Sequence, residues 1–147
     1  MIRALEHGDW EAWKPLWDGY LRFYREPLAD EITRETFRRL CDRADGMRGL
    51  LALDDGGVAV GLAHLIFHPS TWTTTTKCYL EDLFVSRSSR GGGTGRALIK
   101  AVYAEADAAG AQSVYWHTQQ FNAPARSLYD TVAHNTSFIV YERELGA

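Results

Sequence analysis

A stretch rich in glycine and arginine separates a strand-like segment from a helix-like one: Arg90-Gly91-Gly92-Gly93-Thr94-Gly95-Arg96. Glycines permit positive φ angles and close backbone approach, and the free amides at the start of a helix attract anions. The arginines add charge that can pair with phosphate groups. The spacing matches neither the dinucleotide fingerprint G-x-G-x-x-G nor the Walker motif. We therefore predict a turn that binds a pyrophosphate, and the alternative is a glycine-rich turn without a ligand.

The elements that must position this turn follow from the spacing of apolar residues. Tryptophans, leucine and tyrosine at intervals of three and four predict a helix over 9–25, and helical spacing resumes from residue 33. Two apolar runs around Asp55-Gly56-Gly57 predict a β-hairpin. Further along, the pattern predicts a strand over 77–85, a helix over 95–109, a strand over 112–119, a helix over 122–133 that Asn122 caps, and a last strand over 136–147.

With a first strand near residues 2–5, the expected order is β-α-α-β-β-β-α-β-α-β. The hairpin is antiparallel, whereas the later strand–helix–strand crossover implies parallel pairing, so the sheet should be mixed. A chain of 147 residues suits one compact domain. We expect an α/β (α+β) fold over residues 1–147, with a central mixed sheet flanked by helices.

Composition excludes several classes of function. A formal net charge of −3 provides no basic field for nucleic acid. No apolar run approaches the ~20 residues that cross a bilayer, and the first residues carry acids and tryptophans, so we expect a cytoplasmic protein away from membranes. We predict that Cys41 and Cys78 are reduced thiols in the core. The histidines are scattered without the spacing of a zinc site, and we expect no metal; they are His64, His68, His117 and His134.

Two motifs resemble those of the GCN5-related N-acetyltransferases, the GNAT family. Arg90-x-x-Gly93-x-Gly95 is similar to the family signature Q/R-x-x-G-x-G/A, whose loop amides hold the pyrophosphate of acetyl-coenzyme A. One strand later, Asn122, Ala125, Leu128 and Tyr129 match the motif N-x-x-A-x-x-L/F-Y. The strand "YLEDLFV" looks like the "LEDFFV" strand of diamine acetyltransferases, and the histone-acetyltransferase-like branch is also similar.

The resemblance implies acetyl-coenzyme A as cosubstrate. Two strands of this fold splay apart, and the pantetheine arm pairs with the backbone of one of them, here Leu83, Phe84 and Val85. The whole turn from Arg90 to Arg96 would hold the pyrophosphate, and Asn122 would bond the pantetheine arm as well as capping its helix. The segment "DTVAHNTSFIVY" replaces the usual glycine-aromatic pair after Tyr129, so the connection to the last strand departs from the family pattern.

Acetyl transfer to an amine needs a base, because an alkylammonium with a pKa of about 10.4 must lose a proton before it attacks. Glu81 lies between Tyr79 and Leu83 on one face of its strand, where desolvation would raise its pKa, and Asp82 lies on the other face. The resemblance also gives Glu81 as base. Asp82 is the competitor, and both acids could instead only solvate the strand end or bind an arginine.

The departing thiolate benefits from a proton. The phenol of Tyr129, with a reference pKa of about 10 against about 8.5 for a thiol, can donate one, although this residue could also simply pack its helix on the sheet. A backbone N–H near Phe84 or Val85 would stabilise the oxyanion.

The acceptor groove of the family lies at the first two helices and their loop. Here this region supplies Tyr20, Tyr24 and Glu26, which together with Asp82 would bind a cationic amine. We expect a diamine or polyamine; a protein lysine is the alternative, and a non-catalytic acyl-coenzyme A sensor is a second class. Homodimerisation is implied by the family alone.

Overall fold

The computed structural model describes residues 1–146. Two compact units are present, the first spanning Met1–His117 and the second beginning at Thr118. The assignment of residues 1–147 to a single domain stays a prediction.

The first unit is built on one mixed five-stranded sheet. Its strands are β1 (Ile2–Ala4), β2 (Met47–Leu53), β3 (Ala59–Pro69), β4 (Thr76–Val85) and β5 (Val114–Tyr115), and they lie side by side in chain order. The first four pair antiparallel, and β5 pairs parallel to β4. The turn between β2 and β3 is closed by Asp54, whose Oδ1 accepts the amides of Gly56 and Val58. The mixed sheet and the hairpin are thus confirmed.

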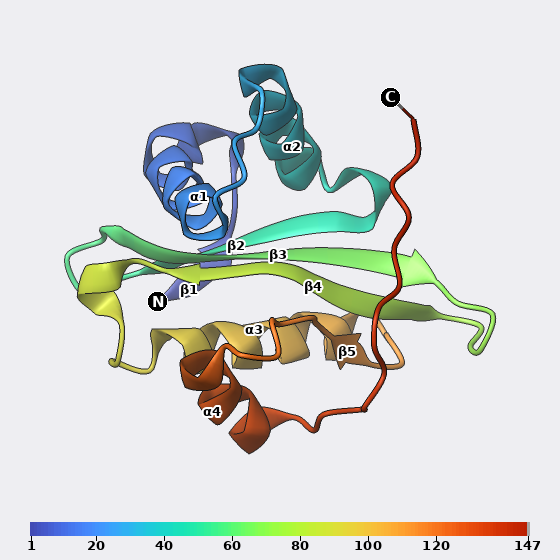
Figure 1. Ribbon diagram of the computed structural model, residues 1–147. Helices are drawn as coiled ribbons and strands as arrows, with labels where there is room; N and C mark the ends of the chain where they lie inside the picture. The colour runs from blue at the N-terminus through green and yellow to red at the C-terminus, as the bar shows by residue number, and fades with distance from the viewer. Residues whose placement is uncertain (147) are drawn as a thin grey trace. The chain divides into compact units, whose positions relative to one another are not determined.

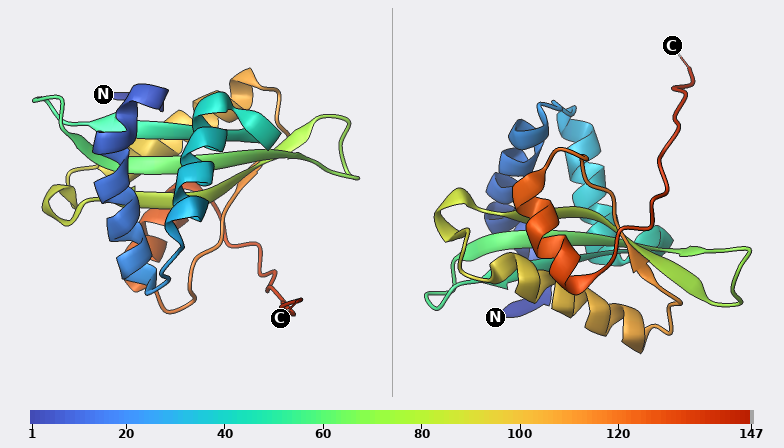
Figure 2. Two further views of the ribbon diagram at one scale, coloured as in Figure 1. Left: turned by 90° about the horizontal axis from the view of Figure 1, so that it is seen from above. Right: turned by 60° about the horizontal axis from the view of Figure 1, so that its bottom comes forward.

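Helices cover both faces of this sheet (Figure 1). Helices α1 (Trp10–Tyr24) and α2 (Asp30–Asp42) lie side by side across one face, as the left panel of Figure 2 shows, and α3 (Thr94–Ala108) covers the other. The α1 bounds match the predicted helix within one residue. Helix α2 begins at Asp30, three residues before the position from which helical spacing was predicted to resume.

The core beneath α1 and α2 is aromatic and aliphatic. Trp13 stacks on Trp17 with ring centroids 5.6 Å apart and contacts Phe37 of α2. Leu51 of β2 and Leu62 of β3 are fully buried in the same cluster. The buried Trp17 indole donates a 3.2 Å hydrogen bond to the Thr33 hydroxyl, which joins the two helices through a polar contact inside an apolar layer.

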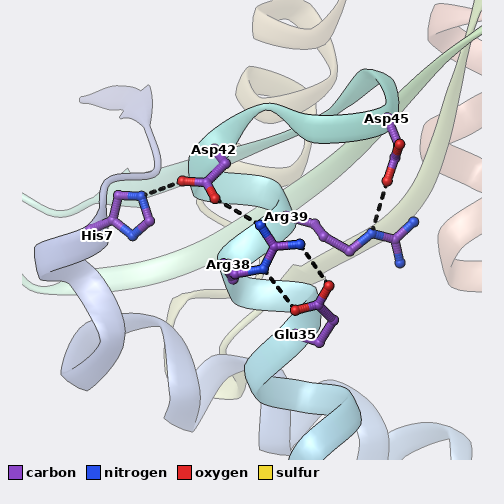
Figure 3. Close-up of polar contacts among 6 residues, drawn as sticks. All are labelled: His7, Glu35, Arg38, Arg39, Asp42 and Asp45. Atoms are coloured by element: carbon purple, nitrogen blue, oxygen red, sulfur yellow. Dashed lines mark hydrogen bonds and ion pairs between the residues drawn. The ribbon is translucent and has the colours of Figure 1, made fainter.

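The solvent side of α2 carries a chain of ion pairs (Figure 3). Arg38 binds Glu35 and Asp42 on its own helix, and Asp42 also bonds His7 in the short 3-10 turn before α1. Arg39 reaches Asp45 in the turn that follows α2. Exposed pairs of this kind contribute little individually, because solvent screens them. The pairs join α2 to the 3-10 turn before α1 and to the turn that follows α2.

Both cysteines are free. Burial is the main cause that raises the pKa of Cys78 to about 11, and that of Cys41 also to about 11. Each is therefore a protonated thiol at neutral pH. Cys78 is buried in the core as predicted, whereas Cys41 is only partly buried against it.

The second unit contains α4 (Ala123–Val132). The side chain of Asn122 accepts the amide of Ala125 at 3.4 Å, which confirms the predicted cap. The predicted last strand is wrong for the described residues: 136–146 are irregular, and no strand pairs with them. A strand requires a neighbour for its backbone groups, and Ser137 interrupts the extended chain with a φ of 69°. The strand predicted over 112–119 is also shorter, since only Val114–Tyr115 is paired.

The Trp17–Thr33 contact should carry measurable stability. In Thr33→Val the buried indole N–H loses its acceptor, and we expect the free energy of unfolding to fall by about 1–3 kcal/mol in urea titrations. Thr33→Ser keeps the hydroxyl and loses one methyl group, which is worth about 0.8 kcal/mol. If the serine variant proves as unstable as the valine variant, the hydrogen bond is not the source of the effect.

Candidate active site

The pairing of β4 changes partway along the strand. Strand β5 contacts it only at Cys78, opposite Val114, and at Tyr79, opposite Tyr115. Beyond that point β4 pairs with β3 alone, through Leu83, Phe84 and Val85 among others. The opposite edge of these three residues therefore has no strand partner within residues 1–146, as the predicted pantetheine-binding edge requires.

A β-bulge lies at Glu81. His64 of β3 pairs with Asp82 and the next residue, Leu65, pairs with Leu80, so Glu81 is an additional residue without a partner across the ladder. The predicted regular alternation of Tyr79, Glu81 and Leu83 on one face is therefore wrong. Directly paired residues share a face of the sheet, and His64 and Leu65 lie on opposite faces. Because of the bulge, Leu80 and Asp82 lie on opposite faces of the sheet. Leu80 is buried, and Asp82 faces α1.

Asp82 is surrounded by residues of α1 and β3. Its Oδ2 lies 2.8 Å from Nδ1 of His64, and 15% of its side chain is exposed. Burial, followed by the charge of Asp82 and a hydrogen bond to it, raises the pKa of Tyr20. Burial followed by the charge of Asp82 also raises the pKa of Tyr24. The structure thus brings together three predicted acceptor residues, Asp82, Tyr20 and Tyr24.

Glu26 does not join this group. It lies just after α1, where it lines a surface groove together with Asp18, Arg22 and Arg25. Neither arginine forms an ion pair within the described part of the chain. This groove has both signs of charge, whereas the surroundings of Asp82 combine carboxylates with tyrosines.

Glu81 is exposed to solvent, yet nearby protein atoms still desolvate its carboxyl group. This desolvation, followed by repulsion from Asp82, raises the pKa of Glu81, while His64 and Arg39 act in the opposite direction. A raised pKa brings a carboxylate closer to the range in which it accepts and releases protons near neutrality. The two neighbouring acids thus differ in environment: Glu81 is an exposed residue, and Asp82 is bonded to His64.

His64 is a site residue that the sequence interpretation discarded. It is only 3% exposed and accepts a 3.0 Å hydrogen bond from the indole of Trp13 on its second ring nitrogen. The available signal was its place inside the apolar run "GLAHLIF", because a buried imidazole must find polar partners. An acid on a neighbouring strand was the natural candidate.

The glycine turn joins the unpaired end of β4 to α3. A 3-10 turn (Arg87–Ser89) comes first, and Gly91 and Gly93 both have a φ of +86°, which favours glycine. Gly93 is the N-cap of α3 and provides no side chain for the amides of Thr94, Gly95 and Arg96. These amides lack helical partners and suit an anion. A pyrophosphate therefore fits the turn.

Arg90 folds back toward the sheet. Its Nε donates a 3.1 Å hydrogen bond to the carbonyl of Val85, and its guanidinium lies 5.6 Å from the ring centroid of Phe84. The structure thus places Arg90 at the end of the unpaired edge, while Gly92 and Arg96 are exposed in the turn and in α3. These positions suit their predicted cofactor roles, which stay predictions.

Tyr129 and Asn122 lie in the second unit, on α4 and at its cap. Their spacing on one short helix is the spacing that the motif requires. The predicted roles of Tyr129 as general acid and of Asn122 as a pantetheine ligand stay predictions.

Comparison with known proteins agrees with this geometry. The family model described as "Acetyltransferase (GNAT) family" matches residues 11–133, and the chain belongs to that family. It is 38% identical to the D-amino-acid N-acetyltransferase HPA3 of Saccharomyces cerevisiae over 144 residues, which is 97% of this chain and 89% of the yeast protein. It is 29% identical to the uncharacterized N-acetyltransferase YhfO of Bacillus subtilis, over 95% of this chain and 94% of the other. The branch of the family stays a prediction.

Solved structures show the same fold. The aminoglycoside N-acetyltransferase AAC(6')-Iy, in complex with the bisubstrate analogue CoA-S-monomethyl-acetylneamine, superposes with a TM-score of 0.85 at 21% identity, over 99% of this chain and 98% of the other. A ribosomal-protein-alanine N-acetyltransferase from Brucella melitensis gives 0.83 at 20% identity, over 99% of each chain. Within residues 1–146, no helix has the length and apolar character needed to cross a membrane.

The glycine turn should be essential for binding of the cosubstrate. In Gly93→Val, a β-branched residue must adopt a φ of +86° beside the amides of α3, and we expect the affinity for acetyl-coenzyme A to fall at least about tenfold, or 1.4 kcal/mol, in calorimetry. Gly57→Val is the matched control, because Gly57 has a φ of +80° in the β2–β3 turn. Equal affinity in the two variants would contradict a pyrophosphate site at this turn.

The raised pKa of Glu81 has a consequence for stability. In the folded protein the ionised carboxylate of Glu81 is disfavoured. The free energy of unfolding therefore falls as the pH rises from the unfolded-state pKa of about 4.3 toward the higher folded-state pKa. Glu81→Gln should therefore be more stable than the wild type at pH 7 and lose this advantage below about pH 4. Thermal unfolding at both pH values tests this, with Glu142→Gln as the control for removal of an exposed charge. A gain that is independent of pH would contradict it.

Proposed function

We propose that the protein transfers an acetyl group from acetyl-coenzyme A to the primary amine of a small molecule. The observation that carries this proposal is the course of β4, whose unpaired edge begins beside Glu81 and Asp82 and leads directly into the glycine turn. One strand thus offers backbone groups for the pantetheine arm and carboxylates for the amine. The family membership supports the same reaction.

Acetyl-coenzyme A supplies the thioester that the amine attacks. The edge of Leu83–Val85 would hold its pantetheine arm, and the turn from Arg90 to Arg96 its pyrophosphate. Glu81, which is exposed as a residue and has a raised pKa, would take the proton of the ammonium. A backbone amide near Phe84 would stabilise the oxyanion. Tyr129 would protonate the departing thiolate.

We propose an amino acid as the first class of acceptor. The support is the 38% identical relative that is described as a D-amino-acid N-acetyltransferase. An amino acid carries a carboxylate beside its amine, and Arg22 and Arg25 at the end of α1 are cations without an ion-pair partner in the described residues. The guanidinium groups could pair with that carboxylate.

A diamine or polyamine is the second candidate. The observation that favours it is the pair of adjacent carboxylates at Glu81 and Asp82 beside Tyr20 and Tyr24, a setting for more than one cationic group. Such an acceptor would gain nothing from Arg22. Arg22→Ala therefore separates the two classes, because it should raise the KM of an amino acid and leave that of a diamine unchanged.

The experiment that tests the function measures thiol release from acetyl-coenzyme A. The acceptor panel holds D- and L-amino acids, diamines, polyamines and lysine peptides, and calorimetry measures binding of acetyl-coenzyme A in parallel. Turnover with one class of amine identifies the acceptor. Tight binding of acetyl-coenzyme A without turnover on any amine would instead support a sensor.

Glu81→Gln tests the proposed base. We expect acetyl transfer to fall by about 10² to 10⁴, the usual contribution of a general base, and the pH optimum to move upward because the amine must then lose its proton without assistance. The affinity for acetyl-coenzyme A should stay within about twofold of the wild type. Unchanged turnover would show that Glu81 is not the base.

A further inference from the structure

A chain of two hydrogen bonds runs from the core to Asp82. The indole Nε1 of Trp13 lies 3.0 Å from Nε2 of His64, and Nδ1 of His64 lies 2.8 Å from Oδ2 of Asp82. Exposure rises along this chain, from 0% for Trp13 and 3% for His64 to 15% for the Asp82 side chain. The chain thus connects a fully buried donor with a carboxylate at the surface of the site.

The direction of these hydrogen bonds follows from their chemistry. An indole N–H can only donate, so Nε2 of His64 must accept. The ring proton of a neutral imidazole then resides on Nδ1, from which it is donated to Asp82. Trp13 therefore selects one tautomer of His64, and that tautomer makes Asp82 a hydrogen-bond acceptor.

The imidazole ring is also held in place by packing. Its centroid lies 5.9 Å from that of Trp13 and 5.2 Å from that of Trp17, and both tryptophans belong to the buried cluster beneath α1. A ring enclosed in this way keeps one orientation. The Asp82 carboxylate is thereby fixed by one oxygen, whereas no hydrogen bond from a described residue holds the carboxylate of its neighbour Glu81.

We propose that His64, oriented by Trp13, is a positioning residue that holds Asp82 as the anchor for the ammonium group of the acceptor, which leaves removal of the proton to Glu81. This inference rests on the proposed amine acetyltransferase activity and deepens it. The two adjacent acids then have separate tasks. The fixed one places the amine, and the one on the bulge, which lacks such a tie, exchanges the proton.

The first test is the tautomer of His64, which can be measured without activity. Imidazole nitrogen–proton correlation spectra of the ¹⁵N-labelled wild-type protein at neutral pH should show His64 with its proton on Nδ1. In Trp13→Phe, which keeps an aromatic ring and removes the N–H donor, Nε2 loses its constraint and the spectrum should show a mixture of tautomers. A proton on Nε2 in the wild type would overturn the inference.

The second test is steady-state kinetics of three variants. In Trp13→Phe and His64→Leu we expect the KM of the amine acceptor to rise, by about tenfold in the latter, while kcat at saturating amine and the KM of acetyl-coenzyme A stay within about twofold. His64→Asn retains an N–H for Asp82 and should recover part of the loss. His68→Leu, on the same strand but bonded to Tyr115, is the matched control and should behave as the wild type.

The outcomes separate this inference from the proposed function. Circular dichroism first shows whether Trp13→Phe and His64→Leu are folded. If the wild type acetylates amines and both folded variants keep its KM for the amine, the positioning role is wrong and the proposed function stands. A loss of kcat alone would also overturn the positioning role. Absence of turnover by the wild type on every amine would remove both.

Discussion

The backbone groups of β4 need partners, and the sheet supplies them on both sides for only part of the strand. From Leu80 onward β5 is no longer paired with it, so one row of N–H and C=O groups faces away from the sheet. Such groups bind solvent, another strand or an extended ligand. Because β5 leaves at Tyr79, the open row coincides with the carboxylates and precedes the glycine turn. The open row, the two carboxylates and the glycine turn thus follow in order along one strand and the turn after it.

The aromatic layer beneath α1 determines the hydrogen bonding and the protonation of the polar residues beside it. Trp13, Trp17 and Tyr20 recur at helical spacing along the helix, and their rings form a continuous stack against β3 and β4. In such surroundings an unpaired polar group is costly, so His64 is bonded at both of its nitrogens. The same burial raises the pKa of Tyr20, which therefore stays a phenol beside the carboxylates. An apolar layer thus determines which hydrogen bonds are possible at its rim.

Much of this organisation could be predicted from the sequence. The periodicity of α1, the hairpin at Asp55, and the cap at Asn122 are local features that one segment specifies by itself. The β-bulge could not be predicted, because it arises from the register between two strands and not from either one. For the same reason Glu81 and Asp82 were assigned to faces by strict alternation. The partnership of His64 and Asp82, 18 residues apart, depends on that register too.

The end of the chain shows a different limit. Residues 136–146 contain apolar residues typical of a strand, including Phe138 and Tyr141, which are 91% and 90% exposed. Alternation of side chains predicts that a segment can pair, and it contains no information on whether a neighbour is in reach. Sequence patterns are therefore most informative for helices and caps, whose hydrogen bonds close within the segment, and least informative for strands.

The additional residue in β4 determines which face of the sheet each later side chain of the strand occupies. Asp82 and Phe84 both face the aromatic layer because the bulge has already reversed the alternation once. Deleting Glu81 itself would restore the regular pleat and leave Asp82 opposite His64 and Phe84 opposite Leu62, on the face that they already occupy. Deleting a residue after Asp82, such as Leu83, would instead place Phe84 opposite Ala63 and turn it to the other face of the sheet. The length of β4 after Asp82 is thus constrained in single residues, even where its side chains could vary.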